Sequence, residues 1–141
     1  MNTSLETQSE RSTSNIWISG LIGWALAFVG VLILFGTARL FGVTLQVGTP
    51  PDWTTLIPLP IAQLISATFV PAAVATVLYV ILRLVFKYNA TRIFWVIAVI
   101  ALLLSFGGPL SLAVSTVNKI ILALMHVVTT VAIVWALTLR K

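Results

Sequence analysis

Residues 16–38 have the sequence IWISGLIGWALAFVGVLILFGTA, which contains no charged side chain. A helix of about 20 apolar residues is long enough to cross the hydrocarbon core of a bilayer. Three further predominantly apolar runs follow, at Leu59–Leu82, Ile93–Leu112 and Val117–Leu139. This repetition predicts an integral membrane protein with four transmembrane helices.

The composition of the chain supports the same interpretation. Hydrophobic residues make up 60% of the sequence and charged residues only 8%, too few to cover the surface of a soluble domain. The formal net charge of +5 comes from basic residues that flank the apolar runs, so we do not expect binding to nucleic acid. The absence of cysteine excludes disulfides, thiolate metal sites and cysteine nucleophiles. The expected partner of most of the surface is therefore the lipid bilayer.

The connections between the runs predict the fold class. We expect an all-α protein, a four-helix transmembrane bundle with antiparallel up-down topology, whose loops are short except the first external loop. Residues 16–141 would form this single membrane domain, and the mainly polar residues 1–15 a disordered cytoplasmic tail. The tail lacks the basic character of a signal peptide, so we expect the first helix to remain as an uncleaved anchor.

The distribution of basic residues predicts the orientation in the membrane. With four spans, both termini and the second loop lie on one side of the bilayer. The basic residues of that side are Arg11, Arg83, Lys87, Arg92, Arg140 and Lys141. The opposite side carries Arg39 and Lys119. Because cytoplasmic loops are enriched in Lys and Arg, we predict a multi-pass protein of the cell inner (plasma) membrane with both termini in the cytoplasm.

The joints contain residues that interrupt helices. The first loop, Arg39–Pro58, has glycines and prolines around a short alternating piece, Val43–Val47, and we expect it to be the external segment able to form a lid. The Gly-Gly-Pro sequence at 107–109 is expected to end the third helix, and Ser115 or Thr116 to cap the fourth. The last two spans would then form a tight antiparallel hairpin.

Small residues recur at helical spacing on two of the spans, where they would let neighbouring backbones approach. These stripes are Ser19, Gly23, Ala27 and Gly30 on the first span, and Ala98, Ala101, Ser105 and Gly108 on the third. We predict that both stripes are contact faces between helices. Pro71 lies near the middle of the second span and removes one backbone hydrogen bond, so we expect a kink there.

Polar side chains within the spans concentrate in the outer half of the predicted bundle. The candidate ligand-binding residues are His126, Lys119, Arg39, Gln63, Ser66 and Thr130. His126 lies about 13 Å along the helix from the outer end of the fourth span, close to the bilayer centre. An ionisable side chain at this depth is costly when charged, so it should face the interior of the bundle and find a hydrogen-bond partner.

Two interpretations of His126 are open. In the first, it forms the floor of an outward-facing polar pocket, with Lys119 and Arg39 near the mouth, suited to a small polar or anionic ligand. In the second, it is a structural histidine bonded to a hydroxyl across the bundle, while the two cations reach lipid headgroups. The hydroxyls considered for this bond are those of Ser66, Thr68 and Ser105.

Other chemistries find less support in the sequence. Zinc requires three or four ligands, and one histidine without cysteine or an intramembrane acid cannot supply them. The acidic residues lie outside the spans, so nucleophilic catalysis lacks an orienting acid and we expect no enzymatic activity. We predict no cofactor, and haem bound between the His126 side chains of a homodimer remains as an alternative.

The last two spans also resemble a known family. Residues 102–137, LLLSFGGPLSLAVSTVNKIILALMHVVTTVAIVWAL, are similar to the C-terminal hairpin of a bacterial four-span membrane-protein family of unknown function, domain of unknown function 6069. The similarity is greatest at Thr116, Lys119, Leu122, Leu124, Met125 and His126, and extends to Gly23–Leu26 and Pro71. The resemblance implies a four-helix membrane fold with no established activity, and it adds no catalytic residue.

From the sequence we therefore predict a non-enzymatic accessory or interaction protein, in a larger membrane complex or as a homo-oligomer. The alternatives are a binder or transporter of a small polar or anionic ligand, through a pocket floored by His126, and a haem-binding homodimer. An interaction subunit should co-purify with its partner, whereas a binder should gain thermal stability with its ligand.

Overall fold

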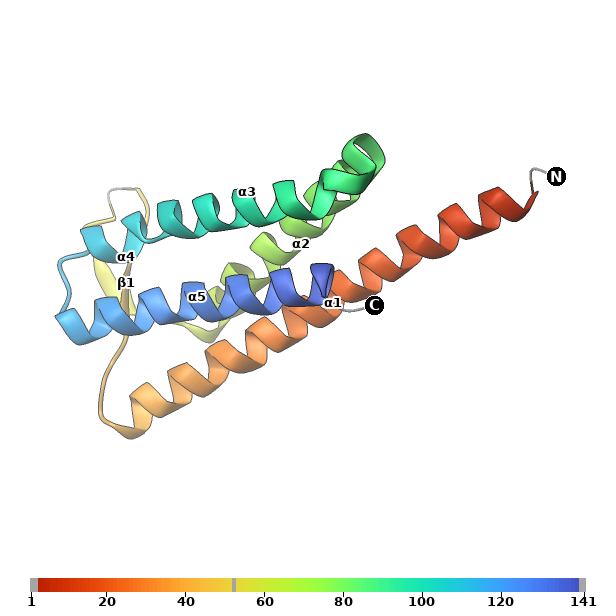
Figure 1. The fold of residues 1–141 in the computed structure, drawn as a ribbon. Coiled ribbons are helices and arrows are strands. Elements are labelled where there is room, and N and C mark those ends of the chain that lie inside the picture. Colours follow the sequence, from red (N-terminus) through yellow and green to blue (C-terminus); the bar gives the residue numbers. More distant parts are fainter. Residues whose placement is uncertain (1–2, 52, 140–141) are drawn as a thin grey trace.

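The computed structural model of the protein describes residues 3–51 and 53–139, with side chains described from residue 15 onward. The elements are α1 (Thr3–Leu40), β1 (Gln46–Gly48), β2 (Leu56–Pro58), α2 (Ile61–Phe86), the 3₁₀ helix η1 (Lys87–Asn89), α3 (Ala90–Ser105), α4 (Gly107–Ser111) and α5 (Thr116–Thr138). The long helices form a bundle, with β1, β2 and α4 together at one end (Figure 1). η1 and the C-terminal end of α5 lie at the opposite end.

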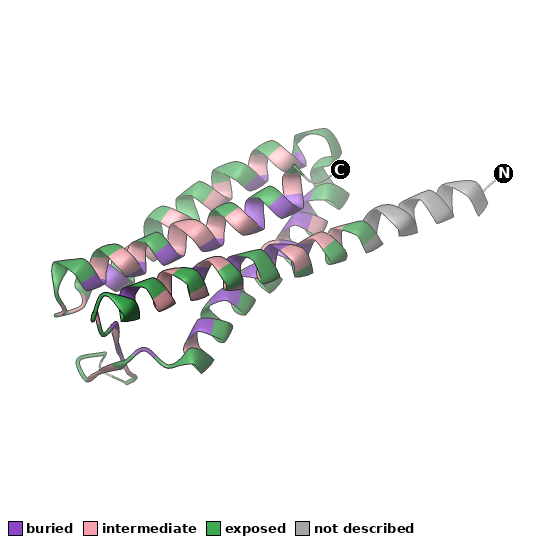
Figure 2. Ribbon diagram, turned by 90° about the horizontal axis from the view of Figure 1, so that it is seen from below, coloured by how far each residue is buried: buried purple, intermediate pink, exposed green. Residues whose placement is uncertain are grey.

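Three helical segments within the described ranges are long and apolar enough to cross a membrane: Asn15–Leu40, Ile61–Ser111 and Thr116–Thr138. Exposed aliphatic and aromatic side chains form much of their outward surface, whereas buried residues gather where helices meet (Figure 2). So large an apolar surface is unfavourable in water and favourable in lipid. The structure therefore has the helices that a membrane protein requires.

The segment Ile61–Ser111 contains both the second and the third apolar run of the sequence. The chain turns at Lys87, where φ is 37°, and α3 returns alongside α2 (Figure 1). Near this turn the hydroxyl oxygens of Tyr79 and Thr91 lie 3.0 Å apart, and the ring centroids of Tyr79 and Phe94 are 4.9 Å apart. These contacts fasten α3 to α2 at the η1 end of the bundle.

α1 begins at Thr3, so the structure has helix in residues 3–14, where the sequence predicts a disordered tail. Extending an existing helix costs far less than starting one, and the apolar part of α1 supplies the start. That apolar part begins at Asn15, next to the predicted boundary at residue 16.

α1 packs closely against α5 along its small residues. A methyl group added at Gly23 would lie 3.1 Å from the Cβ of Ala136, and one added at Gly30 would lie 2.6 Å from the Cγ1 of Val128. Ala27, between these glycines, is fully buried. The predicted contact face on the first span is confirmed at Gly23, Ala27 and Gly30, because side chains there would keep the backbones apart.

The first loop contains a small sheet that the all-α prediction misses. β1 and β2 pair antiparallel, with Val47 opposite Ile57. Beyond this pair, the N–H of Leu59 donates to the carbonyl of Leu45 at 2.8 Å, and both leucine side chains are buried. β-branched residues favour extended backbone, and burial of one face holds the hairpin on the bundle. The predicted extended piece, Val43–Val47, overlaps β1.

The third joint differs from the predicted tight turn. α3 ends at Ser105, and the glycines that follow belong to the short helix α4. Pro109 lies in the first turn of α4, where its missing N–H breaks no helical hydrogen bond. Ser115 caps α5 as predicted, since its Oγ accepts a hydrogen bond from the N–H of Asn118 at 3.3 Å.

Candidate ligand-binding cavity

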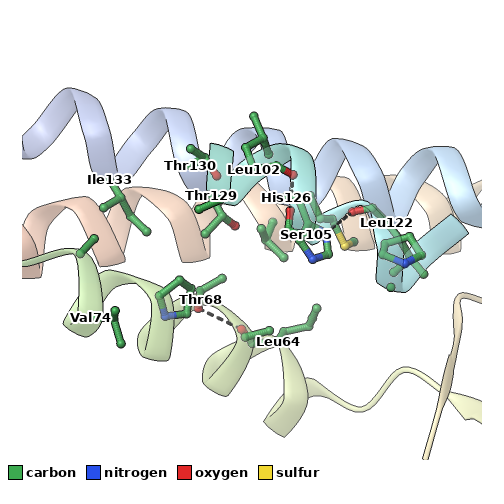
Figure 3. Close-up of a pocket in the computed structure, with 18 of the residues that line it drawn as sticks. Leu64, Thr68, Val74, Leu102, Ser105, Leu122, His126, Thr129, Thr130 and Ile133 are labelled. Atoms are coloured by element: carbon green, nitrogen blue, oxygen red, sulfur yellow. Dashed lines mark hydrogen bonds between the residues drawn. The ribbon is translucent and has the colours of Figure 1, made fainter. Parts of the chain in front are cut away.

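A cavity of about 630 Å³ lies between α2, α3 and α5. Figure 3 shows side chains of α5 facing side chains of α2 across the space. Gly48 and Trp53 of the first loop line one end, and Leu78 and Phe94 line the other. Most of the residues between these ends are aliphatic or small. The cavity therefore extends along the apolar helices, is partly open, and is bordered at one end by the first loop.

Small residues on α3 and α4 leave the space for this cavity. The whole predicted stripe lines it: Ala98, Ala101, Ser105 and Gly108. A methyl group placed at Gly108 would have no neighbour within 4 Å, in contrast to the glycines of α1. The facing part of α2 is also small, with Ala67 and Ala75 in the cavity wall. The α3 stripe therefore borders open space along its length, although Ala98 also packs against the buried core cluster.

The hydroxyl groups that border the cavity on α2 and α3 are bonded within their own helices. Thr68 Oγ1 donates to the carbonyl of Leu64 at 2.9 Å, and Ser105 Oγ donates to the carbonyl of Leu102 at 2.7 Å (Figure 3). Bonds to a carbonyl three or four residues earlier satisfy a hydroxyl proton without a partner on another helix. Each of these two oxygens therefore offers only its lone pairs to the cavity.

His126 is also bonded to its own helix. Its Nδ1 lies 2.8 Å from the carbonyl oxygen of Leu122, and its half-buried ring extends from α5 into the cavity (Figure 3). Because a carbonyl oxygen only accepts, Nδ1 carries the proton, and Nε2 of the neutral ring has a free lone pair. The bonds to Ser66, Thr68 or Ser105 that the structural interpretation expected are not formed.

Further polar groups remain available in the cavity wall. The side chains of Thr129, Thr130 and Gln63 line the cavity and make no hydrogen bond within the part of the chain that the structure describes. α2 continues as a helix through Pro71, which has no N–H, so the carbonyl of Ala67 lacks its usual helical donor. Pro71 and Ala67 both line the cavity, so the backbone bond that the sequence analysis expected Pro71 to remove is missing beside it.

The six candidate residues from the sequence divide into two sets. His126, Gln63 and Thr130 line the cavity, whereas Lys119, Arg39 and Ser66 do not. Lys119 Nζ donates to the carbonyl of Leu110 in α4 at 3.0 Å, and the guanidinium carbon of Arg39 lies 5.2 Å from the ring centroid of Phe35. Ser66 is exposed and bonds the carbonyl of Gln63. The two cations therefore do not form the predicted mouth of a pocket.

Asn118 has a structural role that the sequence analysis missed. Its Oδ1 accepts from the N–H of Gln46 at 2.9 Å, and its Nδ2 donates to the carbonyl of Gln46 at 3.0 Å. Asn118 is 2% exposed and Gln46 is half-buried, so both bonds are partly buried. Asn118 thus pairs with β1 as another strand would, and it fixes the hairpin to the start of α5 over the end of the cavity. An asparagine in an apolar run is the signal that could have indicated such an anchor.

One protein-family model matches residues 11–141, and its description is a family of unknown function (DUF6069). The chain belongs to this family. The match contains every residue that lines the cavity, and it confirms the family resemblance seen in the last two spans. The comparison with curated proteins and the comparison with solved structures found no match. Because DUF6069 is defined without a function, the function has to be argued from the cavity.

Proposed function

We propose that this DUF6069 member is a non-enzymatic, four-span membrane protein that binds one predominantly apolar small molecule between α2, α3 and α5. The observation that carries the proposal is the cavity of about 630 Å³. Its size falls within the range of roughly 300–1,000 Å³ that is usual for sites of small organic ligands. Apolar walls with a few polar groups are also usual for such sites.

The lining favours an apolar ligand over the small anionic ligand expected from the sequence. An anion requires cations or several hydrogen-bond donors, and neither Lys119 nor Arg39 lines the cavity. An unfilled apolar cavity also forfeits the dispersion contacts that its wall atoms would make with an occupant. A ligand that restores these contacts would stabilise the bundle.

The four-span arrangement rests on the reversal at η1. With α3 returning alongside α2, the segment Ile61–Ser111 would cross the bilayer twice. The 16 residues of α3 fall short of the usual span, and α4 continues the crossing at the outer end. The basic residues near η1 and after α5 support an inner-membrane orientation with both termini in the cytoplasm.

Reporter fusions test this orientation independently of ligand binding. A fusion after Lys141 should report the cytoplasm, and a fusion inserted between Gly48 and Trp53 should report the exterior. A cytoplasmic signal from both positions would contradict the four-span topology, and exchanged signals would contradict the charge argument.

Thermal unfolding of the purified protein tests ligand binding. Membrane-soluble compounds with an aliphatic body should raise the melting temperature, because a ligand at 100 times its Kd stabilises the folded state by about 2.7 kcal/mol. The control is Ala101→Leu, which extends a side chain into the cavity and should reduce the shift. No shift with any compound, or equal shifts in both proteins, would contradict the proposal.

The accessory or interaction role expected from the sequence stays a separate prediction. It would be supported if the protein purified in mild detergent only together with a larger membrane protein and showed no ligand-dependent stabilisation.

A further inference from the structure

We propose that the ligand is a neutral amphiphile with a hydroxyl head and an aliphatic body, and that the hydroxyl donates a hydrogen bond to Nε2 of His126. This inference rests on the proposed function, since it assigns the chemistry of a ligand in the same cavity. It depends on the balance of hydrogen-bond donors and acceptors in the cavity wall.

The ring of His126 is held so that its acceptor faces the cavity. The bond from Nδ1 to the carbonyl of Leu122, at 2.8 Å, fixes both the tautomer and the orientation of the ring. His126 lies ten residues into α5, about 15 Å from its first residue at a rise of 1.5 Å per residue. A neutral imidazole whose proton lies on Nδ1 has its lone pair on Nε2.

The groups around His126 are mainly acceptors. Thr68 and Ser105 have given their hydroxyl protons to backbone carbonyls of their own helices, at 2.9 and 2.7 Å. The carbonyl of Ala67 has no helical donor because Pro71 lacks an N–H. Residues with acceptor atoms on three helices therefore line one apolar space: His126 from α5, Ala67 and Thr68 from α2, and Ser105 from α3.

The available donors are fewer than the acceptors. Thr129 and Thr130 lie three and four residues after His126, on the neighbouring turn of α5, and Gln63 lies in the first turn of α2. An acceptor buried without a donor loses the free energy of its hydrogen bonds to water. A ligand with a donating hydroxyl satisfies that deficit, whereas an ether or ester presents further acceptors.

The aliphatic body of the ligand is required by the remaining lining. Val74, Ile97, Ile133 and the ring of Phe94 form the part of the cavity beyond His126, toward the η1 end. A polar body would leave its own groups without partners against these side chains. A ligand that matches both the polar surroundings of His126 and the apolar lining beyond it has one hydroxyl and a hydrocarbon portion.

A matched ligand pair tests the inference: 1-tetradecanol and its methyl ether, 1-methoxytetradecane. Binding to the purified full-length protein in nanodiscs is measured by titration of the melting temperature. We expect the alcohol to bind about tenfold more tightly, as one additional hydrogen bond near 1.4 kcal/mol would give. His126→Leu should abolish this preference while retaining binding of the ether. Ser66→Ala, a control that removes an exposed hydroxyl outside the cavity, should keep the preference.

A second measurement needs no variant, since the chain contains one histidine. Selective ¹⁵N-histidine labelling should give a protonated Nδ1 and an unprotonated Nε2, and the alcohol should shift the Nε2 resonance whereas the ether should not. Equal binding of alcohol and ether, or an Nε2 resonance that the alcohol leaves unchanged, would overturn the inference and leave the proposed function intact. Failure of both ligands to bind would overturn the proposed function and the inference together.

Discussion

α1 and α3 carry similar stripes of small residues. The stripe on α1 packs against α5, whereas the stripe on α3 borders a cavity. On α1, a methyl group at Gly23 would lie 3.1 Å from a side chain of α5. On α3, Ala98 and Ala101 line a space of about 630 Å³. Small residues permit close approach of backbones, but the facing helix decides whether the approach occurs.

The comparison first predicts that enlarging a side chain is most harmful on α1. Gly23→Leu should lower the free energy of unfolding by about 3 kcal/mol, because the added atoms overlap α5 and force the helices apart. Denaturant unfolding in detergent measures this loss. The control is Gly36→Leu on the same helix, where an added methyl group has no neighbour within 4 Å. Equal losses in both variants would show that the α1–α5 contact is less tight than described.

A smaller loss of stability is expected at the first loop, which borders one end of the cavity. Asn118→Leu removes both hydrogen bonds to Gln46 and leaves a half-buried backbone N–H and carbonyl without these partners, so stability should fall by about 2 kcal/mol. The amide of Gln46 should also exchange its hydrogen faster. Ser66→Ala, at an exposed hydroxyl, should change stability by less than about 0.5 kcal/mol. Unchanged exchange at Gln46 in Asn118→Leu would show that other contacts hold the hairpin.

The smallest change in the free energy of unfolding is expected on the α3 stripe, where it should be an increase. Ala101→Leu should raise the free energy of unfolding of the ligand-free protein by about 1 kcal/mol, because the larger side chain gains contacts in the cavity. Unfolding of the delipidated protein measures this gain. A loss comparable to that of Gly23→Leu would mean that α3 is as tightly packed as α1.

Features that depend on local sequence could be predicted from it. The apolar runs define the helices, Ser115 caps α5, and the glycines of α1 mark a contact face, because each follows from hydropathy, capping or residue size along one helix. The extended piece in the first loop also follows from its alternating residues.

Features that depend on two distant segments could not be predicted in the same way. The cavity arises from the spacing of α2, α3 and α5, which no single run specifies. The bond of His126 to Leu122 replaces the expected bonds across the bundle, because a carbonyl of its own helix is within reach. Lys119 similarly bonds a carbonyl of α4, a helix that the Gly-Gly-Pro sequence did not suggest.

The most direct test of the central claim, that the cavity holds a ligand, is native mass spectrometry of the protein extracted from its own membrane. The account predicts one bound small molecule per chain in the wild-type protein and a marked loss of that molecule in Ala101→Leu, with both proteins equally folded. The same adducts in both proteins, or none in either, would contradict the claim that the space between α2, α3 and α5 is a binding site.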